Sequence, residues 1–295
     1  MPDVTSPVLI TTDLDRTLLF SRHATAQLGG ALPAEPVETP GGPASPESAA
    51  ELCHAARDCL AALPAHATLC VATSRSVNRL ARLRLPFATP YAIAANGGVV
   101  LVDGAPDQCW ATRTKRLLAA AAPATEVRAV LAGREGPGRP DAGPDSGCGP
   151  AWLLRMGDDD ELCCLAIVDL ALFGPGESGP LARRCGELGW EASLIGRKLY
   201  AFPVGFGKEH AALYVAERMA ALAGAAPRRL AAGDTEHDRR MLAGADVAWV
   251  PAGSELAALP ADGEFTVTRL PGHAAAAQIT SEWLGHCRDG GPASC

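Results

Sequence analysis

The 295-residue sequence has few aromatic residues, no long hydrophobic run and no excess of basic residues. No segment reaches the roughly 18 consecutive apolar residues typical of a membrane-spanning helix, so we predict no membrane partner. The formal net charge of -7 argues against nucleic-acid binding, which requires a basic surface. Residues 1–7 lack the basic and apolar segments of a secretory signal. We therefore expect a small-molecule ligand, and the sequence gives no indication of oligomeric state.

The ten cysteines show neither the spacing of a metal site nor that of a disulfide framework. Several of them, such as Cys70, Cys163 and Cys164, lie inside apolar segments, where a free thiol behaves as a small hydrophobic side chain. We predict reduced, structural cysteines and a cytoplasmic location, because disulfides are rare in the cytosol.

Apolar segments typical of buried strands alternate with helical patterns near both ends of the chain. The predicted strands are residues 7–12, 68–72, 91–95, 228–231 and 246–250, and the predicted helices are 46–63, 76–83, 207–222 and 236–242. Ser45 is a plausible N-cap of the first helix, with Pro46 at its first position. This order predicts an α/β fold with a Rossmann-like parallel sheet covered by helices on both faces.

The middle third of the chain has more predicted strands than helices. The strands are 99–102, 151–156, 162–170, 190–195 and 198–202, and the helices are 110–131 and 179–188. We predict a core domain from residues 1–98 and 204–295, interrupted by a small α+β domain at 99–203. Residues 29–44 and 133–150 are rich in Gly and Pro and are predicted to be loops, the first of them a flap over the site.

Polar residues follow four of the predicted elements. Asp13 and Asp15 come directly after the first strand, where two close carboxylates repel each other and favour a bound divalent cation. Such a pair alone is equally typical of a turn or a helix cap. Thr73-Ser74-Arg75 follows the second strand, where hydroxyl and guanidinium groups can bind a phosphate or merely cap the next helix.

The other two groups lie near the end of the chain. Lys208 begins a predicted helix, where a cation opposes the helix dipole unless an anion is held nearby. Asp234 lies between a predicted strand and the next predicted helix, and Asp238 lies in the first turn of that helix. Each group alone has an ordinary structural interpretation. Because the carboxyl ends of parallel strands share one edge, their common position predicts a single ligand site.

These residues resemble the four motifs of the haloacid dehalogenase (HAD) superfamily in order and spacing. More narrowly, the chain resembles the Cof-type, or IIB, subfamily, which includes sucrose-phosphatase-like and mannosyl-3-phosphoglycerate-phosphatase-like enzymes. The segments that carry the resemblance are Asp13-Leu14-Asp15-Arg16-Thr17-Leu18, Thr73-Ser74-Arg75, Asn96-Gly97-Gly98, Lys208, Gly233-Asp234 with Asp238, and Met241-Leu242. The subfamily's large C2-type cap is inserted between the second and third motifs, where the inserted domain is predicted.

The resemblance implies a Mg²⁺-dependent phosphatase acting on a small phosphomonoester such as a sugar phosphate. Asp13 would form an aspartyl-phosphate, and Asp15 would act as general acid and then base. Thr73 and Lys208 would hold the phosphoryl oxygens.

The resemblance also implies which residues bind metal and substrate. The metal ligands would be Asp13, Asp234 and the backbone carbonyl of Asp15, with Asp238 supporting the metal or Lys208. The predicted substrate-binding residues are Ser74, Arg75, Asn96 and Gly97.

The sequence departs from the subfamily at two positions. His237 replaces the usual Asn, and Ser74 replaces the usual Gly of a Thr-Gly-Arg run. A phosphomutase on the same scaffold and a noncatalytic ligand sensor remain alternative interpretations. A nucleic-acid phosphatase is disfavoured by the acidic charge.

Overall fold

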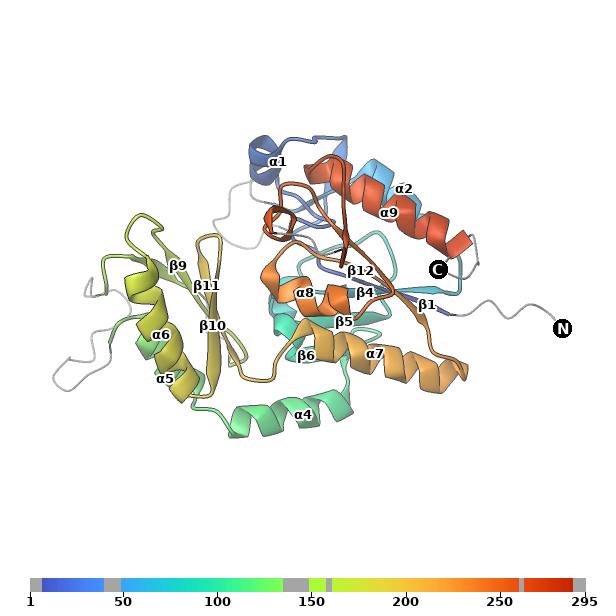
Figure 1. The fold of residues 1–295 in the computed structure, drawn as a ribbon. Helices are drawn as coiled ribbons and strands as arrows, with labels where there is room; N and C mark the ends of the chain where they lie inside the picture. The colour runs from blue at the N-terminus through green and yellow to red at the C-terminus, as the bar shows by residue number, and fades with distance from the viewer. Residues whose placement is uncertain (1–6, 40–48, 135–148, 158–160, 260–262, 289–295) are drawn as a thin grey trace. The chain divides into compact units, whose positions relative to one another are not determined.

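The computed structural model describes residues 7–39, 49–134, 149–157, 161–259 and 263–288 (Figure 1). By their contacts these residues divide into two compact units, Met1–Asp107 with Gly207–Cys295, and Gln108–Phe206. The first unit contains a mainly parallel sheet covered by helices, and the second contains an antiparallel sheet with helices of its own. The predicted fold class is therefore confirmed.

An eight-stranded sheet forms the centre of the first unit, in the order β14-β13-β12-β1-β4-β5-β6-β7. The pairs from β14 to β5 are parallel, and β6 and β7 add antiparallel at the edge. The strands are β1 (Val8–Thr12), β4 (Ala67–Ala72), β5 (Tyr91–Ala94), β6 (Val99–Val102), β7 (Ala105–Pro106), β12 (Arg228–Ala232), β13 (Val247–Val250) and β14 (Thr266–Val267). The five strands predicted near the chain ends are confirmed.

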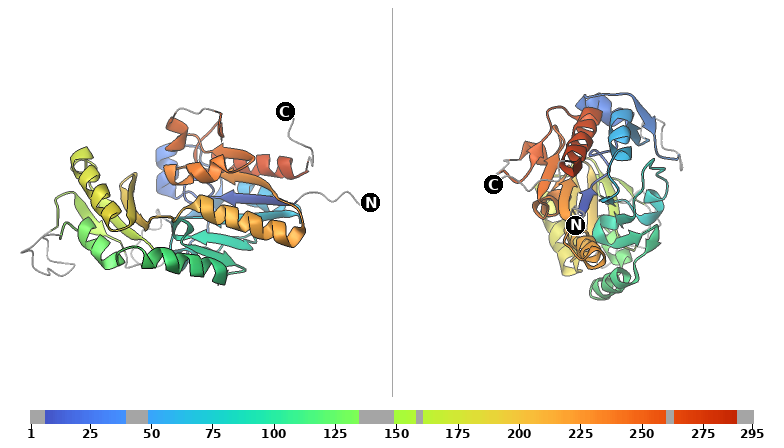
Figure 2. Two further views of the ribbon diagram at one scale, coloured as in Figure 1. Left: turned by 60° about the horizontal axis from the view of Figure 1, so that its bottom comes forward. Right: turned by 90° about the vertical axis from the view of Figure 1, so that its right-hand side faces the viewer.

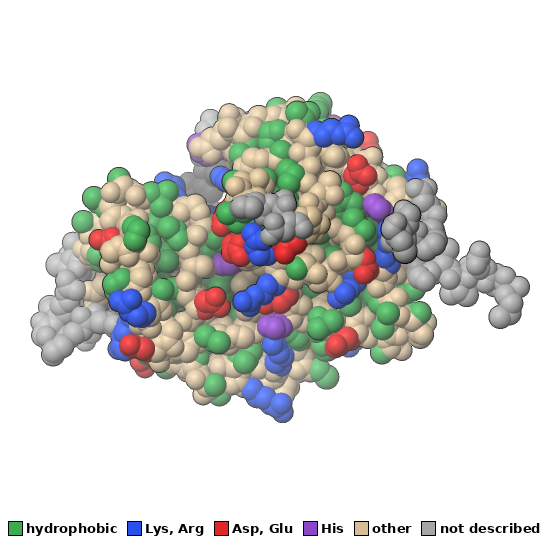
Figure 3. Space-filling model, in the orientation of Figure 1, with side chains coloured by type: hydrophobic (Ala, Val, Ile, Leu, Met, Phe, Trp, Pro, Cys, Tyr) green, Lys and Arg blue, Asp and Glu red, His purple; other side chains and the backbone are tan. Residues whose placement is uncertain are grey.

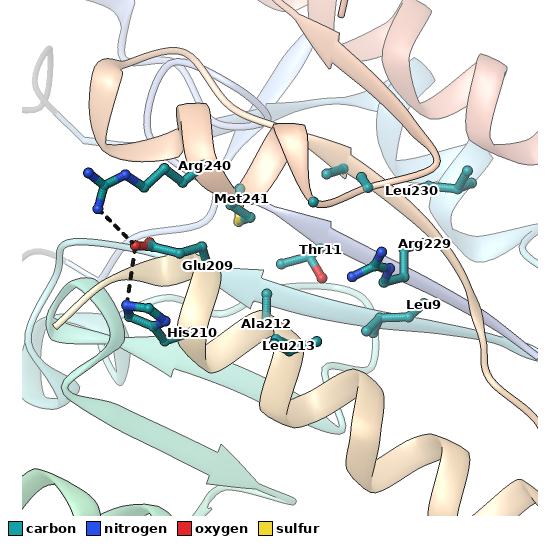
Figure 4. A pocket seen from close by; sticks show the side chains of 13 residues that line it. Leu9, Thr11, Glu209, His210, Ala212, Leu213, Arg229, Leu230, Arg240 and Met241 are labelled. Atoms are coloured by element: carbon teal, nitrogen blue, oxygen red, sulfur yellow. Dashed lines mark ion pairs between the residues drawn. The ribbon is translucent and has the colours of Figure 1, made fainter. Parts of the chain in front are cut away.

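Helices bury both faces of this sheet (Figures 1 and 2). They are α1 (Arg22–Leu28), α2 (His54–Ala61), α3 (Val77–Leu80), α7 (Lys208–Ala223), α8 (Glu236–Ala243) and α9 (Gly272–Arg288). Ile10 of β1 shares a core with Ile279 and Trp283 of α9. Leu9 and Thr11, on the opposite face, line a small pocket with residues of α7 and α8 (Figure 4). Strand β1 is buried on both faces, which explains its continuous apolar character.

Two predictions about residues 29–63 are wrong in part. The predicted loop contains β2 (Ala34–Pro36), which pairs with β3 (Glu51–Cys53). Residues 51–53 of the predicted helix form strand β3 instead, and α2 starts only at His54. Leu52 is fully buried by strand pairing and core contacts, which gives the same apolar spacing that favoured a helix. Ser45 and Pro46 lie outside the described residues.

The first unit extends beyond the predicted domain boundary at residue 98. Strand β6 pairs antiparallel with β5, so its backbone hydrogen bonds place it in the large sheet. The contact division accordingly falls after Asp107 and after Phe206, later than the predicted boundaries at 99 and 204.

The second unit has a four-stranded antiparallel sheet in the order β10-β11-β9-β8. Its elements are α4 (Gln108–Ala119), α5 (Ala124–Leu131), β8 (Leu153–Met156), β9 (Cys164–Val168), α6 (Pro175–Glu187), β10 (Trp190–Ile195) and β11 (Lys198–Pro203). The single helix predicted over 110–131 is two helices, because Pro123 lacks the N–H that a helix interior requires. Trp190 is buried in this unit's core and donates its Nε1–H to the Ala122 carbonyl at 2.9 Å.

The cysteines in the described part of the chain are all free. No helix among the described residues is long and apolar enough to cross a membrane. Most of the loop predicted at 133–150 lies outside the described residues.

Gly97 allows a close backbone approach at the edge of the large sheet. Ala95, Asn96 and Gly97 all have positive φ, with 96° at Gly97. A Cβ atom at Gly97 would overlap the backbone of Gly207, the residue just before α7. Only glycine fits here, because it combines the left-handed conformation with the missing side chain.

We expect Gly97→Ala to destabilise the protein more than Gly104→Ala. Gly104 also has positive φ, but a Cβ there would meet no atom within 4 Å. The control should therefore lose only the backbone cost of about 1–2 kcal/mol, and Gly97→Ala should lose clearly more. Urea unfolding of both variants measures the difference, and equal losses would contradict the proposed overlap.

Candidate active site

Three parallel strands bring the predicted motifs to one edge of the large sheet. Thr12 at the end of β1 lies opposite Val71 of β4 and Ala232 of β12. The residues that follow these positions, including Asp13, therefore emerge at the same level. Strand β1 lies between β4 and β12, and such a reversal of strand order creates a crevice at the carboxyl edge of an α/β sheet.

Lys208 is the centre of this site. Its Nζ lies 2.6 Å from Oδ1 of Asp13 and 2.6 Å from Oδ1 of Asp238. All three side chains are buried, with at most 7% of any of them exposed. Burial by itself would lower the pKa of Lys208, but the two carboxylates outweigh it and raise the pKa. The two carboxylates therefore favour the charged form of Lys208.

Asp238 fixes the loop that carries Asp234. Its second oxygen, Oδ2, accepts hydrogen bonds from the backbone N–H groups of Asp234 at 3.2 Å and Thr235 at 3.1 Å, and from Thr235 Oγ1 at 3.0 Å. This is a capping box at the start of α8, where a carboxylate also complements the helix dipole. Gly233 makes the approach possible, because a Cβ there would overlap Asp238. Asp238 thus supports both Lys208 and the Asp234 loop.

Burial and neighbouring carboxylates raise the pKa of both Asp13 and Asp234. Burial, opposed by Lys208 and assisted by Asp238 and Asp15, raises the pKa of Asp13 to about 7. The pKa of Asp234 is also raised well above its ordinary value, first by burial and then by Asp13 and Asp238. No hydrogen-bond donor in the described part of the chain reaches the Asp234 carboxylate, although the residue is only 6% exposed.

These observations fit a bound cation. One carboxylate oxygen each from Asp13, Asp234 and Asp238 lie within 4.8 Å of one another. We call these three residues the carboxylate cluster. Buried, crowded carboxylates with a single lysine are expected to be stabilised by a divalent ion, and an all-oxygen donor set suits Mg²⁺. The Asp15 carboxylate is not part of the cluster, and the ligand role predicted for its backbone carbonyl remains a prediction.

Asp15 forms an ion pair with Arg75. Arg75 Nε and Nη2 donate to the two oxygens of Asp15, each at 2.7 Å, in a bidentate arrangement. Nη1 of the same guanidinium donates to Oε1 of Glu38 at 2.7 Å. Arg75 thus binds two carboxylates of the protein, and the predicted contact with substrate remains a prediction. Glu38 carries no sequence signal, because it lies in a Gly- and Pro-rich segment without a motif.

The other predicted residues lie in two loops that are hydrogen-bonded to each other. Asn96 N donates to the Thr73 carbonyl at 3.0 Å, and Ala95 N donates to the Arg75 carbonyl at 2.8 Å. Thr73 is buried, and its Oγ1 accepts the Arg75 N–H at 3.1 Å. Ser74 is half-buried. The Asn96 side chain is buried, and its Oδ1 has no partner among the described residues.

His237 occupies the position of the usual Asn. Burial, followed by the charge of Lys208, lowers its pKa to about 4. The imidazole is therefore neutral near pH 7 and adds no positive charge beside Asp238.

The pocket shown in Figure 4 belongs to the first unit but is separate from the candidate active site. Glu209 there contacts His210 and Arg240, each at 3.6 Å, and none of the lining residues is a predicted site residue. On the molecular face shown in Figure 3, basic side chains lie among acidic ones and form no continuous stripe.

We expect Lys208→Met to destabilise the protein strongly in the presence of a chelator. Removing the cation leaves buried Asp13 and Asp238 without their shared partner, which typically costs about 3–5 kcal/mol. Urea unfolding at neutral pH measures the loss. Lys115→Met, at an exposed position of α4, is the control and should change stability by less than about 0.5 kcal/mol. A similarly small effect at Lys208 would show that its ion pairs do not stabilise the fold.

Among the comparisons with known proteins, only the comparison of three-dimensional structures finds matches. No protein-family model matches the chain. No curated protein matches it either.

Several solved structures match over nearly the whole chain. Sucrose-phosphatase from Synechocystis, in complex with sucrose and phosphate, has a TM-score of 0.63 and 14% identity, covering 96% of this chain and 98% of its own. A phosphatase of the HAD enzyme superfamily from Bacteroides thetaiotaomicron has a TM-score of 0.54 and 16% identity, covering 97% of both chains.

A trehalose-6-phosphate phosphatase related protein has a TM-score of 0.53 and 15% identity, covering 94% of this chain and 97% of its own. At these identities the likeness shows the fold. The chain therefore has the fold of the HAD phosphatases, as its four motifs predict.

Proposed function

We propose that this protein is a Mg²⁺-dependent phosphatase that hydrolyses a small phosphomonoester through an aspartyl-phosphate on Asp13. The observation that carries the proposal is the buried Asp13 carboxylate, held by Lys208 beside Asp234 at the carboxyl edge of the sheet. A carboxylate held in this way is oriented for attack on phosphorus.

In the first step, an Asp13 oxygen would bond to phosphorus while the bond from phosphorus to the ester oxygen breaks. Asp15, in its protonated form, would donate this proton to the departing alkoxide, which leaves as an alcohol. In the second step, Asp15 would take a proton from water, and the water oxygen would displace Asp13 to release inorganic phosphate. Lys208 and Thr73 would hold phosphoryl oxygens as their charge increases.

The carboxylate cluster would bind Mg²⁺ through Asp13 and Asp234, with Asp238 holding Lys208 and the Asp234 loop. When bound, the ion would supply the positive charge that lets an anionic carboxylate approach an anionic phosphate. The same charge would favour the ionised form of Asp13, whose pKa burial otherwise raises to about 7.

The substrate class is proposed from two kinds of support. Two similar structures are those of a sucrose-phosphatase and of a trehalose-6-phosphate phosphatase related protein, which favours a sugar phosphate. The unit Gln108–Phe206 is inserted between Thr73 and Lys208, where a substrate-selecting cap is expected. The cytoplasmic location remains a prediction.

We expect Mg²⁺-dependent release of phosphate from sugar phosphates by the wild type, and a loss of at least about 1,000-fold in Asp13→Asn because the nucleophile is removed. A panel of phosphomonoesters with and without EDTA measures the release. Asp103→Asn, an exposed carboxylate in another turn, is the matched control and should behave as the wild type. Phosphate release by Asp13→Asn at the wild-type rate would refute the assignment of the nucleophile. Transfer to a second hydroxyl without net release would favour the mutase.

We also expect Mg²⁺ binding to depend on Asp234. Titration calorimetry without substrate should detect binding to the wild type and to Asp103→Asn. Asp234→Asn removes a ligand charge from the carboxylate cluster and should weaken binding by at least about tenfold. Unchanged affinity in this variant would show that the ion binds elsewhere.

A further inference from the structure

Glu38 is connected to the proposed acid/base residue through a single guanidinium. Arg75 donates two hydrogen bonds of 2.7 Å to Asp15 along one edge, and a third of 2.7 Å to Glu38 Oε1 along another. A longer contact of 3.5 Å joins Nη2 to Glu38 Oε2. The Arg75 side chain is 6% exposed, whereas that of Asp15 is 43% exposed. The buried arginine thus holds a carboxylate that solvent can reach.

The backbone around Glu38 is itself held in place. Val37 N donates to the Ala50 carbonyl at 2.9 Å, and Thr39 N donates to the Arg82 carbonyl at 2.9 Å. Ala50 N donates to Oε2 of Glu38 at 3.2 Å. Glu38 is therefore a fixed anchor for the guanidinium rather than a surface side chain that meets it by chance.

The three side chains have distinct geometric roles. A guanidinium is planar and rigid, so fixing one edge fixes the direction in which its other edge points. Glu38 holds Nη1, which leaves Nε and Nη2 directed at Asp15. Without Glu38, Arg75 would be free to rotate toward other anions, and the orientation of Asp15 would be less well defined. Proton transfer requires such orientation, because a general acid must lie within hydrogen-bond reach of the leaving oxygen.

We propose that Glu38 is a positioning residue for catalysis: it fixes Arg75, and Arg75 orients Asp15 for proton transfer to the leaving group. This inference rests on the proposed function. It assigns a catalytic consequence to an acidic residue outside the four motifs. It also gives Arg75 a role in holding the acid.

The test compares two substrates that differ in their need for an acid. An alkyl phosphate such as glycerol 2-phosphate releases a poor leaving group that must be protonated, whereas 4-nitrophenyl phosphate releases a good one that needs little help. The measured quantity is kcat/KM, because it includes steps only up to departure of the leaving group. Glu38→Gln keeps the side-chain shape and an acceptor for Ala50 N while removing the charge that holds Arg75.

We expect Glu38→Gln to lower kcat/KM for the alkyl phosphate by about 30-fold and for the aryl phosphate by less than about threefold, since general acid catalysis contributes roughly 10²–10⁴. Glu35→Gln is the matched control. Glu35 lies in the same segment and pairs with Arg57 at 3.1 Å, and it has no contact with Arg75 or Asp15. Its ratio between the two substrates should equal that of the wild type.

A second comparison separates positioning from general destabilisation. In an Arg75→Lys background, Glu38→Gln should change the substrate ratio no further, because both residues act through the same contact. Equal losses on both substrates, or no loss, in Glu38→Gln would overturn the positioning role while leaving the phosphatase intact. A wild type that releases phosphate from no member of the phosphomonoester panel would instead overturn the proposed function and, with it, this inference.

Discussion

Lys208 is a buried cation whose two partners come from distant parts of the sequence, and the site depends on this contact. Asp13 follows β1, Asp238 belongs to α8, and Lys208 begins α7, so one ammonium joins three elements. A buried charge without partners would be very costly, and the same holds for each carboxylate. Each of these three charged side chains therefore requires an opposite charge close by, and this pairing fixes the positions of Lys208, Asp13 and Asp238.

The compensation is incomplete, and this has a chemical consequence. The carboxylate cluster with Lys208 contains three acidic groups and one basic group, and burial together with the neighbouring carboxylates raises the pKa of Asp13 and of Asp234. This cluster is the basis of the proposed Mg²⁺ site. Asp238 is less available for that purpose, because both of its oxygens already accept hydrogen bonds from the protein. Asp13 and Asp234 are thus the better candidates for direct metal contact.

A second charge arrangement lies beside the first. Arg75 has two carboxylate partners, Asp15 and Glu38, so this group carries one formal excess negative charge, against two in the carboxylate cluster with Lys208. The two arrangements divide the site into a part around Lys208 with three carboxylates and a part around Arg75 with two carboxylates. Such a division suits a reaction in which one carboxylate attacks while another transfers a proton, because the two groups need different surroundings.

The sequence alone predicted much of this site, because its residues lie immediately after strands whose apolar character is unambiguous. Asp13 after β1 and Asp234 after β12 reach the same edge in any parallel sheet, whatever the details of packing. The strand β3 was not predicted, since Leu52 and Cys53 become buried by pairing with a segment that has no apolar pattern of its own. The extent of the first unit also differed, because β6 joins the large sheet through hydrogen bonds that no local pattern records.

The order of elements and the position of each motif were thus determined by the sequence itself, through local hydrophobic patterns and strand ends. Only the tertiary structure decided which charges meet. Lys208 and Asp13 are 195 residues apart in the chain, and Arg75 and Glu38 are 37 apart, so no spacing rule connects them. Electrostatic pairing and desolvation act through space, and they take effect only after the sheet has brought these side chains together.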